Sequence, residues 1–201
     1  MKKYLKHYQN LNNIYQEIIT SSDNIAFVNQ GWKPLYVASP LAKILLVGQA
    51  PGLKTQSINM LWNDISGKRL RGWLGIEQQT FYNPDIFAHL PMDFFYPGRG
   101  KNGDLPPRKD FAKKWHPQIL QWMPNIKLII LIGQYAQKYY LQSNYNVNTT
   151  LTVKNYDKYL PKFFPIIHPS PQNLRWIAKN KWFESDVLPK LKDLVYEILS
   201  E

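Results

Sequence analysis

The 201-residue chain contains no cysteine, which excludes disulfide bonds, iron–sulfur clusters and a cysteine nucleophile. A chain without cysteine also fits a reducing compartment, so we expect a cytoplasmic protein. The four histidines lie far apart and do not have the spacing of a metal site, so no metal is expected. The longest aliphatic run, residues 128–132, is far too short to cross a bilayer, and no membrane association is expected.

Acidic residues are scarce relative to basic ones. The chain has 25 Lys and Arg against 14 Asp and Glu, a formal net charge of +11 at pH 7. Such an excess attracts polyanions, and binding to a phosphate backbone would be salt-dependent. The basic residues are spread along the chain and do not form a tail. Nucleic acid is therefore the partner that this charge favours, and a general solubility charge is the alternative.

Short apolar runs that stop at a glycine or histidine predict buried parallel strands over residues 43–47, 127–132 and 163–167. Residues 86–95 are a fourth, weaker candidate, because Pro91 cannot donate a hydrogen bond to a neighbouring strand. Ligands of parallel sheets bind beyond the carboxyl ends of the strands, so the residues that follow these runs are the first place to look for a site.

Apolar residues at helical spacing predict helices over residues 5–18 and 184–199. Two further helices are expected over residues 108–122, after a Pro-Pro pair, and 134–141, after Gly133. Strands that alternate with helices indicate an α/β fold whose sheet is covered on both faces. The length and the 44% apolar content suffice for one well-buried core. We therefore expect a single domain over residues 1–201, with a helical N-terminal extension over residues 1–40 and a motif-bearing core over residues 41–185.

Two of the predicted strands end in unusual polar loops. The first is GQAPG, residues 48–52, whose glycines and proline favour a rigid turn with backbone amides that can face a ligand. The second is HPSPQN, residues 168–173, which places a histidine at a strand end beside two prolines. A single histidine is more often structural than catalytic. One that is held rigidly at a strand end can, however, donate a hydrogen bond to a developing anion.

A GQAPG loop after the first core strand and an HPS loop after the last resemble the paired signature of the uracil-DNA glycosylase superfamily. The first loop is most similar to the GEAPG form of a bacterial branch that carries an iron–sulfur cluster. Three further segments of that branch resemble LWNDISGKRL (residues 61–70), YPGRGKNGDLPPRK (96–109) and KLIILIGQYA (127–136). The resemblance thus covers roughly residues 40–180.

The resemblance implies a three-layer α/β/α sandwich with a four-stranded, mostly parallel central sheet. It also implies a monofunctional DNA glycosylase that works as a monomer in base-excision repair. Such an enzyme flips the damaged nucleotide out of DNA and hydrolyses its N-glycosidic bond with water, so no cofactor is needed. Uracil is the first base to expect.

The resemblance further implies roles for individual residues. His168 would donate a hydrogen bond to the departing base and stabilise its anion. Trp62 would stack on the flipped base, unless it is an ordinary core aromatic. Gly48, Gln49 and Ala50 would line the base pocket. The residues that would contact DNA are Ser170, Pro171, Gln172, Asn173, Leu174, Arg175 and Arg108. For Arg108, a place in a solvated charged loop is the alternative.

The chain departs from the family pattern at three positions. Gln49 replaces the GEAPG carboxylate, and an amide can orient a water molecule but cannot act as a base. Asp64 is the substitute candidate, against a helix cap or a solvated acid. Met92 stands near the place of the asparagine that reads uracil in relatives, which leaves hypoxanthine and xanthine open as substrates. Gln172 stands in place of a wedge leucine, with Leu174 as the nearest apolar substitute.

The similar branch uses four cysteines to hold the segment that corresponds to residues 96–109. In this chain packing must hold it, with Trp115, Trp122 and the Pro106-Pro107 pair as candidates. Two other interpretations remain open. The chain could be a catalytically weak DNA-binding member of the fold, which Gln49 and Met92 favour, or an α/β enzyme that acts on free nucleotides or nucleosides.

Overall fold

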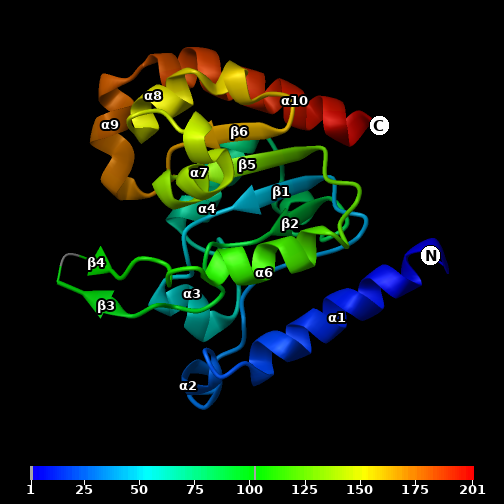
Figure 1. Cartoon of the computed structure of the whole chain (residues 1–201). Coiled ribbons are helices and arrows are strands. Elements are labelled where there is room, and N and C mark those ends of the chain that lie inside the picture. The colour runs from blue at the N-terminus through cyan, green and yellow to red at the C-terminus, as the bar shows by residue number, and fades with distance from the viewer. Residues whose placement is uncertain (1, 102) are drawn as a thin grey trace.

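The computed structural model of the chain describes residues 2–101 and 103–201. The strands are β1 (Ile44–Val47), β2 (Phe87–His89), β3 (Arg99–Gly100), β4 (Gly103–Asp104), β5 (Leu128–Ile132) and β6 (Phe163–Ile166). Four of them form one sheet in the order β2-β1-β5-β6, and all of its pairings are parallel (Figure 1). The other two, β3 and β4, form a small antiparallel hairpin.

The helices lie before, between and after the strands. The α-helices are α1 (Leu5–Thr20), α2 (Ile25–Val28), α3 (Leu53–Ile58), α4 (Ile65–Leu74), α5 (Gln78–Phe81), α6 (Phe111–Leu120), α7 (Gln134–Leu141), α8 (Thr149–Lys154), α9 (Leu174–Lys179) and α10 (Leu188–Ser200). Short 3₁₀ turns are η1 (Lys2–Tyr4), η2 (Gln142–Asn144), η3 (Tyr156–Tyr159) and η4 (Pro171–Asn173), and η5 (Phe183–Val187) is a π-helical turn.

The central strands are buried on both faces, which explains why they read as continuous apolar runs. Along β1, Leu45 and Val47 pack into one core, whereas Ile44 and Leu46 pack into the other. Successive strand side chains point to opposite faces, so a strand between two cores must be apolar at every position. The expectation of a sheet covered on both faces is confirmed.

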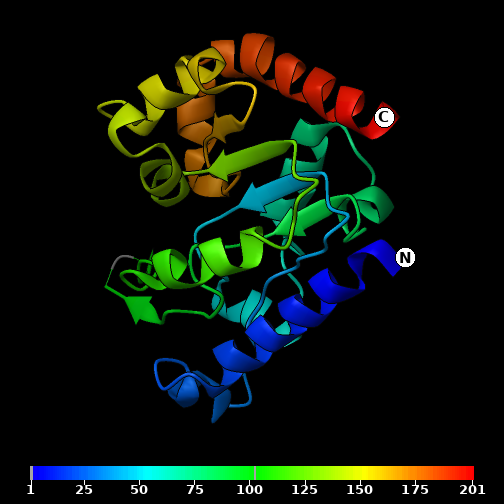
Figure 2. The ribbon, with the colours of Figure 1, turned by 45° about the vertical axis from the view of Figure 1, so that its right-hand side comes forward.

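Two layers of helices enclose the sheet, as the two ribbon views show (Figures 1 and 2). Residues of α1, α6 and α7 enter one core, and residues of α4, α9 and α10 enter the other. The architecture is therefore the expected three-layer α/β/α sandwich. The N-terminal α1 contributes Leu11, Ile14 and Ile18 to the first core, so it packs as part of the sandwich.

Two predicted elements are shorter than expected. The strand expected over residues 86–95 is β2 alone, because the chain then turns back on the loop after β1. There, the amide of Met92 donates to the carbonyl of Gly48 at 2.9 Å, and that of Asp93 to Gln49 at 3.1 Å. The helix expected from residue 108 begins at Phe111, after Asp110 adopts a left-handed φ of 60°.

Candidate functional site

The carboxyl ends of β1, β5 and β6 open into a cleft of about 780 Å³. The loop after each of these strands supplies part of its wall: Gly48–Gly52 after β1, Gly133–Tyr135 after β5, and His168 with Ser170 after β6. In Figure 1 these strand ends point toward α3, α9 and the β3–β4 hairpin. The two polar loops singled out in the sequence therefore lie at one site, where parallel sheets bind their ligands.

His168 is held in one ring orientation at the start of the β6 loop. Its Nδ1 accepts a hydrogen bond from the backbone N–H of Ser170 at 3.2 Å, and its carbonyl accepts one from Nδ2 of Asn173 at 2.8 Å. A backbone N–H can only donate, so Nδ1 must carry no proton and the neutral ring is protonated at Nε2. The loop thus selects the tautomer that makes Nε2 a hydrogen-bond donor.

Burial keeps this ring neutral. Desolvation lowers the pKa of His168 below its usual value, and the negative charge of Asp64 partly opposes that shift. At pH 7 the neutral imidazole can therefore donate a hydrogen bond from Nε2 without adding a positive charge to the cleft. The other histidines are not among the residues that line the cleft, and burial lowers the pKa of both His89 and His116 to about 4.

Trp62 lies in the cleft beside His168. The two ring centroids are 5.7 Å apart, with planes inclined by 33°. A Cβ on Gly48 would stand 3.1 Å from Cζ2 of the indole, so the absence of a side chain at residue 48 lets the ring approach the loop. Trp62 is half-buried at the edge of the second core, so the structure combines the two expected environments, cleft wall and core contact.

Helix α4 and its neighbours hold the backbone of Trp62. This residue has a left-handed φ of 59°, which is costly for a side chain other than glycine. Its carbonyl accepts from Nη1 of Arg71 at 3.2 Å, and a Cβ on Gly67 would lie 1.7 Å from the same oxygen. The contact with Gly67 leaves no room for a larger residue, so the strained Trp62 is fixed by close packing.

Two arginines of α4 support the site, and the sequence analysis did not single them out. Arg71 holds Trp62, while Nη1 of Arg69 donates to the carbonyl of Pro169 at 2.6 Å. One helix thereby fixes the backbone of Trp62 and the loop after β6, which are two parts of the cleft wall. No local pattern distinguishes these arginines from solvated ones, because their partners are set by the tertiary fold.

Gln49 and Ala50 line the cleft, as expected, and are half-buried. The carbonyl of Gln49 accepts from the amide of Asp93, but its side-chain amide has no hydrogen-bond partner within the described part of the chain. This side chain is therefore available to a ligand or to water.

Asp64 lines the cleft and also caps α4. Its Oδ1 accepts from the backbone N–H of Gly67 at 2.8 Å, the bond that defines an N-cap. Of the alternatives for this residue, the helix cap is the one observed. Burial lowers the pKa of His168, and the negative charge of Asp64 partly opposes that shift.

Met92 was expected near the base-reading position, but its side chain belongs to the first core, with 8% exposure. The preceding residue, Pro91, lines the cleft in this part of the wall. The reason is the turn after β2, whose backbone is tied to Gly48 and Gln49. Pro91 has no amide hydrogen to offer a base.

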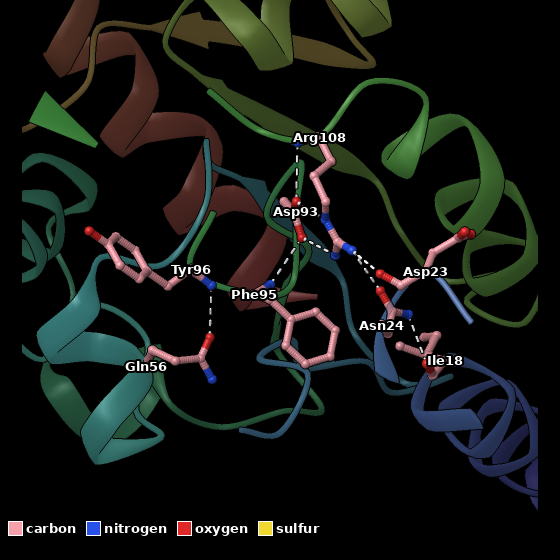
Figure 3. Close-up of polar contacts among 8 residues, drawn as sticks. All are labelled: Ile18, Asp23, Asn24, Gln56, Asp93, Phe95, Tyr96 and Arg108. Atoms are coloured by element: carbon pink, nitrogen blue, oxygen red, sulfur yellow. Dashed lines mark hydrogen bonds and ion pairs between the residues drawn. The ribbon is translucent and has the colours of Figure 1, made fainter. Parts of the chain in front are cut away.

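Arg108 was expected to contact DNA, but in the structure its guanidinium bonds mainly to protein groups, which argues against that role. Figure 3 shows its guanidinium on the carboxylate of Asp93, whose side chain is fully buried, with Nε–Oδ2 at 2.7 Å and Nη2–Oδ1 at 2.8 Å. Nη1 donates to the carbonyl of Asp23 at 2.7 Å and to Oδ1 of Asn24 at 2.9 Å. Four of its five N–H groups are thus used inside the protein.

We call Asp93, Arg108, Asp23 and Asn24 the Asp93 cluster. A buried carboxylate needs a cationic partner, and this requirement determines where Arg108 points. The guanidinium also lies 4.6 Å from the ring centroid of Phe27 and 4.4 Å from that of Phe111. The cluster therefore ties the segment after the hairpin to the N-terminal helices. Trp115 is buried in the first core, and Trp122 packs against that core.

The other residues that were expected to contact DNA lie around the mouth of the cleft. Ser170, Gln172 and Asn173 line it, and Oγ of Ser170 accepts from the amide of Gln172 at 3.3 Å. Pro171, Leu174 and Arg175 are exposed beside them, outside the lining, with Leu174 at 50% exposure. The first two residues of α9, one apolar and one basic, are thus exposed next to this loop.

The β3–β4 hairpin forms a wall that the sequence analysis missed. Pro97, Gly103, Asp104 and Leu105 line the cleft there. A two-residue strand pair leaves no recognisable period in the sequence, so its position depends on the folded chain. The hairpin contributes the carboxylate of Asp104 to the cleft, so Asp64 and Asp104 both line it.

Two structural features are absent from residues 2–101 and 103–201. Within these ranges no group of three or more His, Cys, Asp or Glu side chains is arranged to hold a metal ion. No helix in the same ranges is both long and apolar enough to span a bilayer.

A comparison with known protein families gives a match that covers most of the chain. The family is described as the Uracil DNA glycosylase superfamily, and the match runs over residues 35–192. It includes both strand-end loops, all four strands of the main sheet, the hairpin and helix α4.

Proposed function

Because the chain belongs to the uracil-DNA glycosylase superfamily, we propose that it is a monofunctional DNA glycosylase of base-excision repair. It removes a deaminated base, uracil first, by hydrolysis of the N-glycosidic bond of a nucleotide flipped out of DNA. We assign it to the branch with GEAPG in the first loop, because GQAPG (residues 48–52) resembles that form. The protein acts as a cytoplasmic monomer and needs neither a metal nor a cofactor.

The observation that carries this proposal is the state of His168 in the cleft. Its Nδ1 is occupied by the amide of Ser170, so Nε2 carries the proton. When the glycosidic bond breaks, negative charge develops on the departing base. A fixed, neutral donor in a partly desolvated site stabilises that charge without reorganisation, and removing such a donor typically costs about 10²–10³ in rate.

The base pocket is formed by Trp62 together with Gly48 and Ala50. The indole is fixed between Gly48 and His168, so a base that stacks on it would lie within reach of the imidazole. Base–aromatic stacking is worth about 1–3 kcal/mol. The side-chain amide of Gln49 orients water in this pocket by hydrogen bonds.

DNA binding follows from the overall charge and from the surface beside the cleft. The net charge of +11 attracts the phosphate backbone. Ser170, Pro171, Gln172 and Asn173 approach the damaged strand, and Arg175 contacts a phosphate. Leu174 is half-exposed next to the loop and fills the space that the flipped base leaves.

The substrate base is tested directly with oligonucleotides. Each contains one uracil, hypoxanthine or xanthine, in single- and double-stranded form, and alkali cleaves the abasic product. We expect excision by the wild-type protein, and a loss of about 10²–10³ in rate for His168→Ala with DNA affinity retained. His7→Ala is the matched control, because His7 lies on α1 and is not among the residues that line the cleft.

A second candidate function is DNA binding without excision, which Gln49 favours because it replaces a carboxylate in the first loop. Salt-dependent DNA binding with no cleavage of any of the six substrates would establish this function and refute the glycosylase. Excision that survives in His168→Ala would refute the role of His168 alone.

A further inference from the structure

The glycosylase reaction needs a group that takes a proton from the attacking water, and this inference rests on the proposed function. Gln49 cannot take it, because an amide is not a base at neutral pH. Asp64 and Asp104 are the carboxylates among the residues that line the cleft. Each accepts a hydrogen bond on Oδ1, and the two differ in the donor: a helix-end backbone amide for Asp64 and a side-chain hydroxyl for Asp104.

Asp64 is committed to α4. Its Oδ1 accepts a hydrogen bond from the backbone N–H of Gly67. Without that bond, this N–H in the first turn of the helix would have no partner. A carboxylate that acts as a helix cap has one orientation, set by the helix and not by the reacting sugar. Its charge also lies near His168, where it raises the pKa of the imidazole. Asp64 therefore already has a structural role.

One carboxylate oxygen of Asp104 accepts a hydrogen bond within the protein, and the other faces the loop after β1. Its Oδ1 accepts from the hydroxyl of Tyr96 at 3.3 Å and lies 3.9 Å from Nη1 of Arg99. Its Oδ2 is the atom nearest to the position that a Cβ on Gly52 would take, at 3.7 Å. No hydrogen bond to Oδ2 occurs within the described part of the chain. The side chain is 42% exposed, so water reaches it.

The partner of Asp104 is itself firmly placed. The backbone N–H of Tyr96 donates to Oε1 of Gln56 at 2.9 Å, as Figure 3 shows. Gln56 is buried, and its Nε2 donates to the carbonyl of Lys33 at 2.9 Å. The ring of Tyr96 packs 5.9 Å from that of Trp32. This chain of contacts fixes the hydroxyl that holds Oδ1, so the orientation of Oδ2 is preset.

We propose that Asp104 is the general base of this enzyme and takes over the role for which Gln49 is unsuited. The oxygen of water bonds to C1′ of the flipped deoxyribose, and one water proton passes to Oδ2 of Asp104. The bond from C1′ to the base breaks, and its electron pair leaves with the base as an anion that Nε2–H of His168 stabilises. The proton on Asp104 then returns through solvent to the base, so the products are an abasic site and a neutral base.

The test is single-turnover excision by Asp104→Asn on the best wild-type substrate. We expect a rate loss of about 10² or more, since general bases contribute about 10²–10⁴. DNA affinity stays equal or rises, because the change removes a negative charge near the phosphates. Asp193→Asn is the matched control, since it makes the same change at an exposed residue of α10 that does not line the cleft, and its rate stays within a few-fold of wild type.

Two further variants separate chemistry from structure. Asp104→Glu restores a carboxylate and recovers part of the lost rate, and Tyr96→Phe, which removes the donor to Oδ1, gives a smaller loss than Asp104→Asn. Full activity of Asp104→Asn would overturn the inference. So would a loss in Asp104→Asn that comes with weaker DNA binding or a lower melting temperature.

The failure of this inference differs from the failure of the proposed function. If the wild type excises a base and His168→Ala does not, an active Asp104→Asn overturns only the role of Asp104. If the wild type binds DNA but excises nothing, both fall together.

Discussion

The Asp93 cluster and the cleft are two polar regions of the same molecule with opposite organisation. In the Asp93 cluster, both oxygens of a buried carboxylate are bonded, and Arg108 uses four of its N–H groups on protein acceptors. In the cleft, His168 and Asp104 are each held by one polar atom, while Nε2 and Oδ2 stay available. Polar groups with all their hydrogen bonds made within the protein stabilise the fold, and partly bonded groups in a cleft are free to act on a ligand.

The comparison explains why the sequence suggested a DNA-contacting role for Arg108 while the structure shows a role inside the protein. It lies in a basic, proline-rich segment that resembles a DNA-contacting one, and its charge suits a phosphate. Its actual partner is a carboxylate that cannot be buried alone. The surrounding charge therefore says less about the function of a residue than the number of its donors that remain unbonded.

The largest effect that we predict concerns the Asp93 cluster. Arg108→Ala leaves the carboxylate of Asp93 buried without a cation, and breaking such a pair costs about 3–5 kcal/mol of unfolding free energy. Urea denaturation measures this loss. Lys109→Ala removes an exposed neighbouring charge and serves as the control with little change. A variant of normal stability with weakened DNA binding would show that Arg108 belongs to the DNA surface after all.

An intermediate effect concerns the pH dependence of excision, which follows from His168. Protonation of Nδ1 breaks the bond from Ser170 and adds a charge, so the neutral ring is the active form. Burial lowers the pKa of His168, so the rate is level at neutral pH and falls only below the usual histidine value of about 6.5. Below the midpoint the rate falls about tenfold per pH unit.

Asp64→Asn sharpens this prediction. The charge of Asp64 raises the pKa of His168, so its removal moves the acid limb of the pH–rate profile to lower pH. An acid limb that moves to higher pH, or a midpoint above 6.5 in the wild type, would contradict the electrostatic account of the cleft.

The smallest effect concerns Asp64 as a helix cap. Asp64→Ala loses the bond to the amide of Gly67 and costs about 1 kcal/mol of unfolding free energy, whereas Asp64→Asn keeps a side-chain oxygen and most of the stability. Thermal unfolding of the two variants measures the difference. A hundredfold slower excision by Asp64→Asn would instead make Asp64 the water-activating residue.

The fold was largely predictable because its signals are local. A strand between two cores must be apolar throughout, so β1, β5 and β6 could be located to within one or two residues. Helices α1 and α10 show their buried stripe in the spacing of apolar residues. The strand β2 was overestimated, since the hydrogen bonds that end it go to residues some 40 positions earlier in the chain.

The site was predictable only in part. Both strand-end loops could be found, because glycine, proline and histidine at strand ends form a recognisable motif, whereas Trp62 was found only through the family resemblance. The role of Arg108, the burial of Met92 and the place of Asp104 could not, since each depends on partners from distant segments. Arg108, for example, bonds to residues 84 and 85 positions away.

The sequence by itself determined the sandwich, the location of the cleft at the strand ends and the superfamily, because burial and turn geometry depend on neighbouring residues. Tertiary structure alone decided which polar groups remain available in the folded state. That outcome depends on which donors and acceptors meet across the fold. A buried carboxylate uses the available arginine, and a loop amide sets the tautomer of the histidine.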